Sequence, residues 1–184
     1  MRRSDEELYR LMKRGDREAF AELYERRAPA LYRYALHASG SPTVAEEVAS
    51  EVFVQLMGAG SRYDEQRGSL ESYLYGVTRN LVRMARRQGP VEEPVDSAFE
   101  HDIVGDLIDS ESHAALYRGL RAMPERYRDV VILCELEERS YEEVARLIGR
   151  PVGTVRSRLH RGRALLAGIM RRMKSNELVA TVSR

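Results

Sequence analysis

The chain has 184 residues, enough for one large or two small domains, and its composition of 43% apolar and 32% charged residues fits a folded protein rather than a membrane-embedded one. Its longest strongly apolar run, residues 130–134, is far shorter than the roughly 20 residues of a membrane-spanning helix, and a single cysteine, Cys134, excludes an internal disulfide and any multi-cysteine metal site. The formal net charge of +1 points to no partner by itself, and the first residues show no secretion signal, so we expect a cytoplasmic protein.

Nearly every segment shows the periodicity of an amphipathic helix, and no segment alternates with a period of two for long enough to form a strand. The N-terminal half contains four signals for the start of a helix: Ser4 with Glu7, Asp16, Thr43 with Glu46, and Ser69. Pro29 is expected to kink or interrupt the second of these helices, and the fourth helix should run to about Arg87. The sequence therefore predicts an all-helical protein.

Residues 89–110 form the predicted domain boundary. This segment holds two prolines and many acidic residues but no lysine or arginine, a composition that disfavours a packed core. We therefore expect an acidic flexible linker between two small helical domains. The resulting division of the chain is a first domain at 1–88, the linker at 89–110, a second domain at 111–174 and a tail at 175–184.

The second domain contains a helix-turn-helix pattern. Ser140 with Glu143 forms a capping box that opens a short helix, and Gly149 marks the end of that helix. A longer basic helix then runs from about Val152 to Met173. This order is typical of the helix-turn-helix, whose second helix enters the major groove of DNA.

The two sides of the longer helix differ in character. At about 100° per residue, its apolar residues fall on one side and should be buried: Val155, Leu159, Leu166, Ile169 and Met173. The other side carries the candidate base-reading residues Gly153, Arg156, Ser157, His160 and Arg161. Arginine can bind guanine through two hydrogen bonds, and the flanking Arg158 and Arg163 can bind phosphates. The alternative is an ordinary surface helix with a solvated basic face.

The first domain has a different basic segment, in which aromatic and cationic residues alternate around a glycine-rich loop and the helix after Ser69. The candidate residues are Tyr63, Arg67, Tyr73, Arg79, Asn80, Arg83, Arg86 and Arg87. Aromatic rings stack on unpaired bases while cations follow the backbone, so this mixture favours single-stranded or opened DNA. The alternative is that the aromatic residues, Tyr75 above all, belong to the core.

Charge is strongly segregated along the chain. Residues 62–87 carry a net +3 and residues 141–174 a net +7, whereas residues 88–113 hold eight acidic residues and no lysine or arginine. Two basic blocks separated by an acidic one favour two polyanion-binding modules and a spacer that avoids polyanions. Chance clustering of solvated surface charge is the alternative.

Several motifs resemble bacterial extracytoplasmic-function (group IV) RNA polymerase sigma factors. The C-terminal motifs resemble the promoter-reading domain of that family: PERYR at 124–128, SYEEVA at 140–145 and PVGTVRSRLHRGR at 151–163. In the N-terminal half, AEEVASEVF at 45–53 resembles the segment that docks on polymerase, and YLYGVTRNL at 73–81 resembles the segment that reads and melts the upstream edge of the transcription bubble.

The resemblance implies that the chain directs RNA polymerase core to promoters. It places the residues on the outer side of the 152–173 helix at the −35 element and places Asn80 where a flipped −10 base is captured. Arg150 departs from the family pattern, in which this position is usually small and apolar, and it is either a further phosphate contact or neutral. It also implies that the C-terminal domain sits on the β flap, that the linker runs toward the RNA exit path, and that an anti-sigma factor controls the protein. The residues implied to meet the β′ clamp helices are Glu47, Ser50, Glu51 and Gln55.

Two other functions are compatible with parts of the sequence. A freestanding helix-turn-helix regulator would explain the C-terminal domain but not the aromatic and basic segment of the first domain. An enzyme or metal-binding bundle could use Glu46, Glu47 and Glu51, but the sequence shows no Glu-x-x-His pair, no phosphate loop and no nucleophile with a placed base. We therefore expect no catalytic residue, no cofactor, no metal and no membrane insertion.

Overall fold

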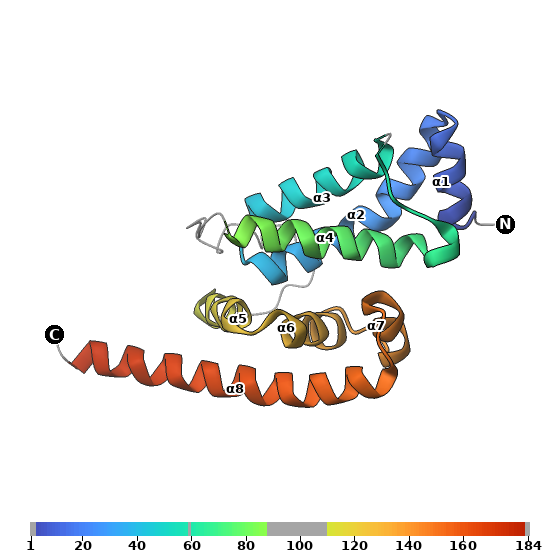
Figure 1. The fold of residues 1–184 in the computed structure, drawn as a ribbon. Coiled ribbons are helices and arrows are strands. Elements are labelled where there is room, and N and C mark those ends of the chain that lie inside the picture. The colour runs from blue at the N-terminus through green and yellow to red at the C-terminus, as the bar shows by residue number, and fades with distance from the viewer. Residues whose placement is uncertain (1–2, 59, 88–109, 183–184) are drawn as a thin grey trace.

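The computed structural model describes residues 3–58, 60–87 and 110–182, and these residues form helices joined by short loops (Figure 1). The helices are α1 (Asp5–Lys13), α2 (Arg17–Ser39), α3 (Pro42–Met57), the 3₁₀ turn η1 (Glu65–Arg67), α4 (Leu70–Arg87), α5 (Ser110–Ala122), α6 (Glu125–Val131), the π-helical segment η3 (Ile132–Leu136), α7 (Tyr141–Ile148) and α8 (Val152–Val182). No strand occurs in these ranges, which confirms the all-helical fold class. The predicted linker lies outside the described residues except for Ser110, which begins α5.

Most predicted helix starts are confirmed by their capping geometry. The Ser4 hydroxyl accepts a hydrogen bond from the N–H of Glu7, and the Glu7 carboxylate accepts one from the N–H of Ser4. Asp16 caps α2 through the N–H groups of two residues of its first turn. The prediction for Thr43 was wrong, because α3 begins one residue before it, at Pro42, with Ser41 as the cap. Proline suits the first turn of a helix, because a backbone N–H at that position would have no acceptor within the helix.

Two helices are longer or more regular than the sequence predicted. α2 runs through Pro29 without interruption, because Pro29 is exposed and water can reach the carbonyl that its ring leaves without a partner. α8, expected to end at about Met173, continues to Val182 and is about 46 Å long. The sequence after Met173 contains no proline or glycine, so nothing in it stops the helix.

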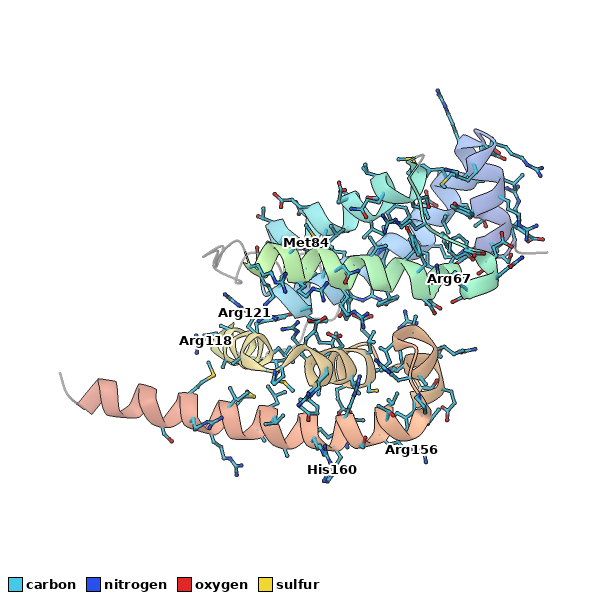
Figure 2. The ribbon with its side chains drawn as sticks, viewed as in Figure 1. Arg67, Met84, Arg118, Arg121, Arg156 and His160 are labelled. Carbon is cyan, nitrogen blue, oxygen red and sulfur yellow. The ribbon has the colours of Figure 1, made fainter. Side chains whose placement is uncertain are left out.

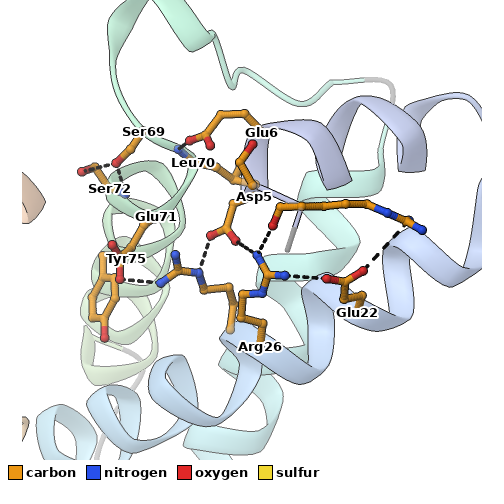
Figure 3. Close-up of polar contacts among 12 residues, drawn as sticks. Asp5, Glu6, Glu22, Arg26, Ser69, Leu70, Glu71, Ser72 and Tyr75 are labelled. Carbon is orange, nitrogen blue, oxygen red and sulfur yellow. Dashed lines mark hydrogen bonds and ion pairs between the residues drawn. The ribbon is translucent and has the colours of Figure 1, made fainter. Parts of the chain in front are cut away.

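The N-terminal helices α1–α4 pack around one apolar core. Its central side chains are buried leucines and valines from all four helices: Leu8, Leu23, Leu31, Val52, Leu56, Leu70 and Leu74. An ion-pair network reinforces this core at one end (Figure 3), where Asp5 pairs with Arg26 and Arg27 and Arg26 pairs with Glu22. The network joins α1 to α2 beneath the start of α4.

The C-terminal helices α5–α8 form a second core. Val130, Val144 and Val155 are each fully buried, one from α6, one from α7 and one from α8. α6 and α8 approach closely at Gly162, where an added Cβ would lie 2.7 Å from Cγ2 of Val131. Gly162 therefore sets the spacing between α8 and the helix that supports it.

The two groups of helices lie against each other as two layers (Figure 1). In this view α5 and α6 lie between α4 and α8, and α7 stands at the end of the second layer beside the start of α4. α8 is thus on the far side of the molecule from α4. No helix within the described residues combines the length and the apolar character that crossing a bilayer requires.

Candidate nucleic-acid and polymerase interfaces

The start of α8 is held rigidly by the helix-turn-helix. Ser140 and Glu143 form the predicted capping box of α7, and Gly149 ends α7 in the left-handed conformation with φ of 62°. Val155 and Leu159 are buried and fix the inner side of α8. This packing leaves the opposite side of the first turns of α8 facing away from the rest of the molecule.

The predicted base-reading residues lie on this outward side of α8. Gly153, Arg156, Ser157, His160 and Arg161 occupy it, and all but Gly153 present polar side chains, all of them exposed. Figure 2 shows Arg156 and His160 pointing away from the remaining helices. The Arg156 guanidinium lies 5.7 Å from the centre of the Tyr141 ring, so the preceding helix holds it toward the reading side.

The three predicted phosphate contacts have different surroundings. Arg150 is exposed in the turn between α7 and α8, and Arg158 is half-buried beside α6. Arg163 is exposed but paired with a neighbouring helical segment, because its Nη2 donates to Oε1 of Glu135 at 2.6 Å. A DNA phosphate at Arg163 would therefore compete with this carboxylate, whereas Arg150 forms no ion pair with any other residue that the structure describes.

A cleft beside the reading helix contains two residues that sequence reasoning missed. It has a volume of about 330 Å³ and is lined by Arg126, Tyr127, Thr154, Ser157, Arg158 and Arg161. Three arginines line it, so the cleft is cationic, and hydrogen bonds from Arg161 and Arg126 lower the pKa of the Tyr127 hydroxyl. Arg126 and Tyr127 belong to α6, and only the close approach of α6 and α8 at Gly162 brings them to this site.

The predicted −10 residues of α4 fall into two groups. Asn80, Arg83 and Arg87 are exposed, and Nη2 of Arg83 donates to Oδ1 of Asn80 at 3.2 Å. Arg79 and Arg86 instead turn toward the C-terminal helices. α4 thus carries six of the eight candidate residues, and among its arginines Arg83, Arg86 and Arg87 are exposed while Arg79 is half-buried.

The candidate residues before α4 form an aromatic cluster and an exposed loop. The Tyr63 ring lies between those of Tyr9, at 5.0 Å, and Tyr73, at 5.5 Å. These ring contacts anchor the loop, and burial raises the pKa of the Tyr63 hydroxyl to about 12. Tyr73 is half-buried at the edge of the cluster, and Arg67 is exposed at the end of η1 (Figure 2).

The structure agrees with a core role for Tyr75. The residue is 5% exposed, its ring packs edge-on against Tyr34, and its hydroxyl accepts a hydrogen bond from Arg139. Burial raises its pKa to about 12. Tyr75 is therefore not available to stack on bases in this arrangement.

The predicted polymerase-docking residues share the outer face of α3. Glu47, Ser50, Glu51 and Gln55 are exposed, and the amide of Gln55 donates to the carboxylate of Glu51 at 2.9 Å. Sequence reasoning missed Val54, which is 55% exposed on the same face. The sequence could have indicated this exposure, because the apolar Val54 is out of phase with the buried positions of α3.

The alternative of a metal-binding bundle concerns Glu46, Glu47 and Glu51 of α3. Within the described residues, no group of three or more histidine, cysteine, aspartate or glutamate side chains could hold a metal ion. Glu46, Glu47 and Glu51 are each exposed on the surface. This acidic face suits contact with a protein better than it suits a buried site.

Comparison with known proteins links both halves of the chain to one family. Residues 23–89 match Sigma-70 region 2, and residues 113–166 match Sigma-70, region 4. The chain is 30% identical over 172 residues to the ECF RNA polymerase sigma factor SigM of Mycobacterium tuberculosis, covering 91% of this chain and 85% of that protein.

Other curated relatives share the same description. SigE of Mycolicibacterium smegmatis is an ECF RNA polymerase sigma factor with 34% identity over 160 residues, covering 79% of this chain and 59% of that protein. SigW of Bacillus subtilis has 26% identity over 170 residues, with coverage of 84% and 90%. The chain thus spans less than two thirds of the length of SigE and most of the length of SigW.

Solved structures share the fold. CnrH in complex with the cytosolic domain of CnrY has a TM-score of 0.66 at 22% identity, covering 89% of this chain and 94% of that one. The sigma factor RpoE of Bartonella quintana, in complex with the anti-sigma factor NepR, has a TM-score of 0.58 at 22% identity, covering 83% and 96%. The arrangement of two helical units is therefore shared with these proteins.

Proposed function

Because the chain belongs to the extracytoplasmic-function RNA polymerase sigma factors, we propose that it brings polymerase core to promoters by reading a −35 element with α8 and a −10 element with α4 and the loop before it. This family consists of transcription initiation factors, and the proposal assigns no catalytic residue. The comparisons do not support a freestanding regulator, because the N-terminal half matches the sigma family as well.

The observation that carries the −35 assignment is the outward face of α8. Arg156 and His160 point into solvent from a helix whose other side is buried, so the helix can enter a major groove without rearrangement (Figure 2). An arginine bound to guanine by two hydrogen bonds contributes about 1–3 kcal/mol of discrimination. The cationic cleft formed with Arg126 is suited to hold a backbone phosphate beside the reading residues.

The −10 assignment rests on α4 and the loop before it. Asn80 and Arg83 are exposed and within hydrogen-bond reach of each other, so one can meet a base while the other meets the backbone. Tyr73 lies at the edge of the aromatic cluster, where a base could stack on it. Stacking and hydrogen bonding would offset the few kcal/mol that unpairing a base costs.

The outer face of α3 suits the β′ clamp helices, because exposed carboxylates surround the apolar side chain of Val54. We place the C-terminal domain on the β flap and the protein in the cytoplasm, where polymerase works. The chain divides in this proposal as domain 1–88, linker 89–110, domain 111–174 and tail 175–184. By analogy with RpoE bound to NepR, an anti-sigma factor is the expected regulator.

Transcription with purified components tests the proposal. Core polymerase supplemented with this chain should give run-off transcripts from genomic fragments, and their start sites should share an upstream sequence. The Arg156→Ala variant should relax the sequence preference near −35, whereas Arg172→Ala, which removes the same charge from an exposed position farther along α8, should not. Failure of the wild-type holoenzyme to initiate from any template would overturn the proposal.

A further inference from the structure

The outer side of α2 and α3 carries an exposed apolar patch. Three of the five large apolar side chains that are exposed in the described part of the chain lie there: Tyr24 is 39% exposed, Val54 55% and Met57 46%. The centre of the Tyr24 ring lies 4.7 Å from that of the buried Phe53, so the patch is continuous with the core beneath it. Apolar side chains gathered on a surface are typical of a site that contacts another protein.

One end of this patch is hollowed by a cleft between the end of α1, the start of α2 and the end of α3. The cleft has a volume of about 310 Å³. Its apolar walls are the side chains of Met12, Phe20 and Met57. Methionine and phenylalanine walls that open to solvent are suited to receive an apolar side chain of a partner.

The walls of the cleft are held in place within the chain. Nζ of Lys13 donates to the backbone carbonyl oxygens of Met57 and Gly58 at 3.4 and 3.3 Å, which ties the end of α1 to the end of α3. On the other side, the Phe20 ring packs edge-on against Phe53 with 6.2 Å between the ring centres. The cleft is therefore formed before a partner arrives, and a preformed site costs less entropy to fill.

Arg17 lines the cleft and is a cation at a position that its own helix disfavours. It is the first residue of α2, where the positive end of the helix dipole lies. Its side chain is exposed and forms no ion pair with any other residue that the structure describes. The adjacent carboxylate of Asp16 is engaged, because it accepts the N–H groups of Glu18 and Ala19. A residue that breaks a local rule without a gain inside the chain indicates a contact outside it.

The cleft continues the docking face of α3. Exposed residues three or four apart form one line along α3 that ends at the cleft: Glu47, Ser50, Val54 and Met57. The far end of this line is acidic, its middle is apolar, and the cleft at its near end carries the cation of Arg17. One partner lying along α3 would therefore reach the cleft without a change of direction.

A protein fits this surface better than a nucleic acid does. The exposed carboxylates of Glu47 and Glu51 would repel the phosphates of a strand that followed α3. The helical segments that bring Met12 and Arg17 to the cleft precede residues 23–89, which match Sigma-70 region 2. The family match therefore does not assign this part of the surface.

We propose that the cleft is a second contact site for RNA polymerase core, which inserts an apolar side chain between Phe20 and Met57 and places a carboxylate at Arg17. The proposal rests on the assignment of the outer face of α3 to polymerase. At the other end of that face, Glu47 and Glu51 meet cations of polymerase. Opposite charges at the two ends fix the direction in which polymerase lies across α3.

Charge reversal of Arg17 tests the carboxylate contact. Arg17→Glu, competing in the full chain with fluorescein-labelled wild type, should bind purified core polymerase about tenfold more weakly at about 0.1 M salt. The loss should fall mainly on the association rate and should shrink at about 0.5 M salt, because salt screens exposed charges. Folding should not suffer, because an acidic residue in the first turn of a helix is favourable.

Met57→Gln tests the apolar contact, because it keeps the length of the side chain and makes its end polar. Core binding should weaken about fivefold, mainly through faster dissociation and with little dependence on salt. Met84→Gln makes the same change at a methionine of α4 that is 55% exposed, and it should bind core like wild type. Arg172→Glu, a charge reversal at an exposed position of α8, is the matching control for Arg17→Glu.

The outcomes separate this inference from the proposed function. Wild-type affinity for core in either Arg17→Glu or Met57→Gln would overturn the inference, and so would a loss in Arg17→Glu that salt does not reduce. A dimer of the free chain in sedimentation that Met57→Gln disperses would show that a second copy covers the patch, and would overturn polymerase as its occupant. If the wild type binds core but initiates nowhere, the promoter assignment fails while these affinities still decide the cleft; if it does not bind core, both fail.

Discussion

Asp129 makes the free energy of unfolding of the protein depend on pH. Its side chain is nearly buried, and it faces Tyr34 from α2, Arg79 from α4, and Glu125 and Arg128 from its own helix. Burial raises the pKa of Asp129 from 3.8 to about 6, although Arg128 and Arg79 oppose the shift. The folded protein therefore favours the protonated carboxyl more than the unfolded chain does.

The sign and size of the effect follow from proton linkage. A raised pKa means that the stabilisation is fully present below pH 3.8 and is lost as the pH rises through about 6. For these two pKa values, the free energy of unfolding should fall by about 1.4 kcal/mol between pH 5 and pH 7.5 on account of this group alone. Above pH 7.5 the contribution should be constant.

Asp129→Asn isolates this contribution, because the amide stays neutral and keeps an oxygen that can accept the Tyr34 hydrogen bond. Urea unfolding of both proteins at pH 5, 6, 7 and 7.5 should show the variant gaining stability relative to wild type by about 1.4 kcal/mol across this range. All other titrating groups cancel in the difference. A difference that stays constant, or that shrinks as the pH rises, would refute the reasoning.

Two further predictions concern α8 and its neighbours. Gly162→Ala should destabilise the protein by about 1–3 kcal/mol in urea unfolding, because the new Cβ would lie 2.7 Å from a methyl group of the stiff side chain of Val131. Gly168→Ala has open space around its Cβ and should stabilise the protein by about 0.5–1 kcal/mol. Similar effects of the two substitutions would contradict the packing argument. Arg126→Ala should weaken holoenzyme binding to every promoter alike and reduce the slope of log affinity against log salt by about one. Arg172→Ala should leave that slope unchanged, and a sequence-dependent effect of Arg126→Ala would show that it reads bases instead.

Local sequence signals predicted the ends of a helix well where a residue has one favourable role, such as capping. Ser140 with Glu143 and Gly149 set the bounds of α7, because each satisfies backbone groups at an end of the helix. The outward side of α8 followed from helical periodicity in the same way. The predicted start of α3 at Thr43 was wrong because Ser41 followed by Pro42 is a second possible N-terminus, and the sequence alone does not show which cap is used.

Contacts between distant segments could not be predicted from one sequence. Nothing in the sequence near Arg126 indicates that α6 would complete a cleft on α8, because that depends on the spacing set at Gly162. Likewise, Arg79 and Arg83 are equivalent as members of a basic segment, yet one pairs with Asp129 and the other is exposed. Hydrophobic periodicity predicts which side of a helix is buried, but it does not predict which other helix packs against that side.

Arg79 belongs to the helix assigned to promoter DNA, and it also contacts the C-terminal half of the molecule. Its guanidinium lies 3.9 Å from a carboxylate oxygen of Glu125 and 3.9 Å from one of Asp129. A substitution of Arg79 therefore removes one of the cationic neighbours of a nearly buried carboxyl group. A transcription defect of such an allele would combine altered promoter binding with altered stability, and unfolding measurements on the same variant would separate the two.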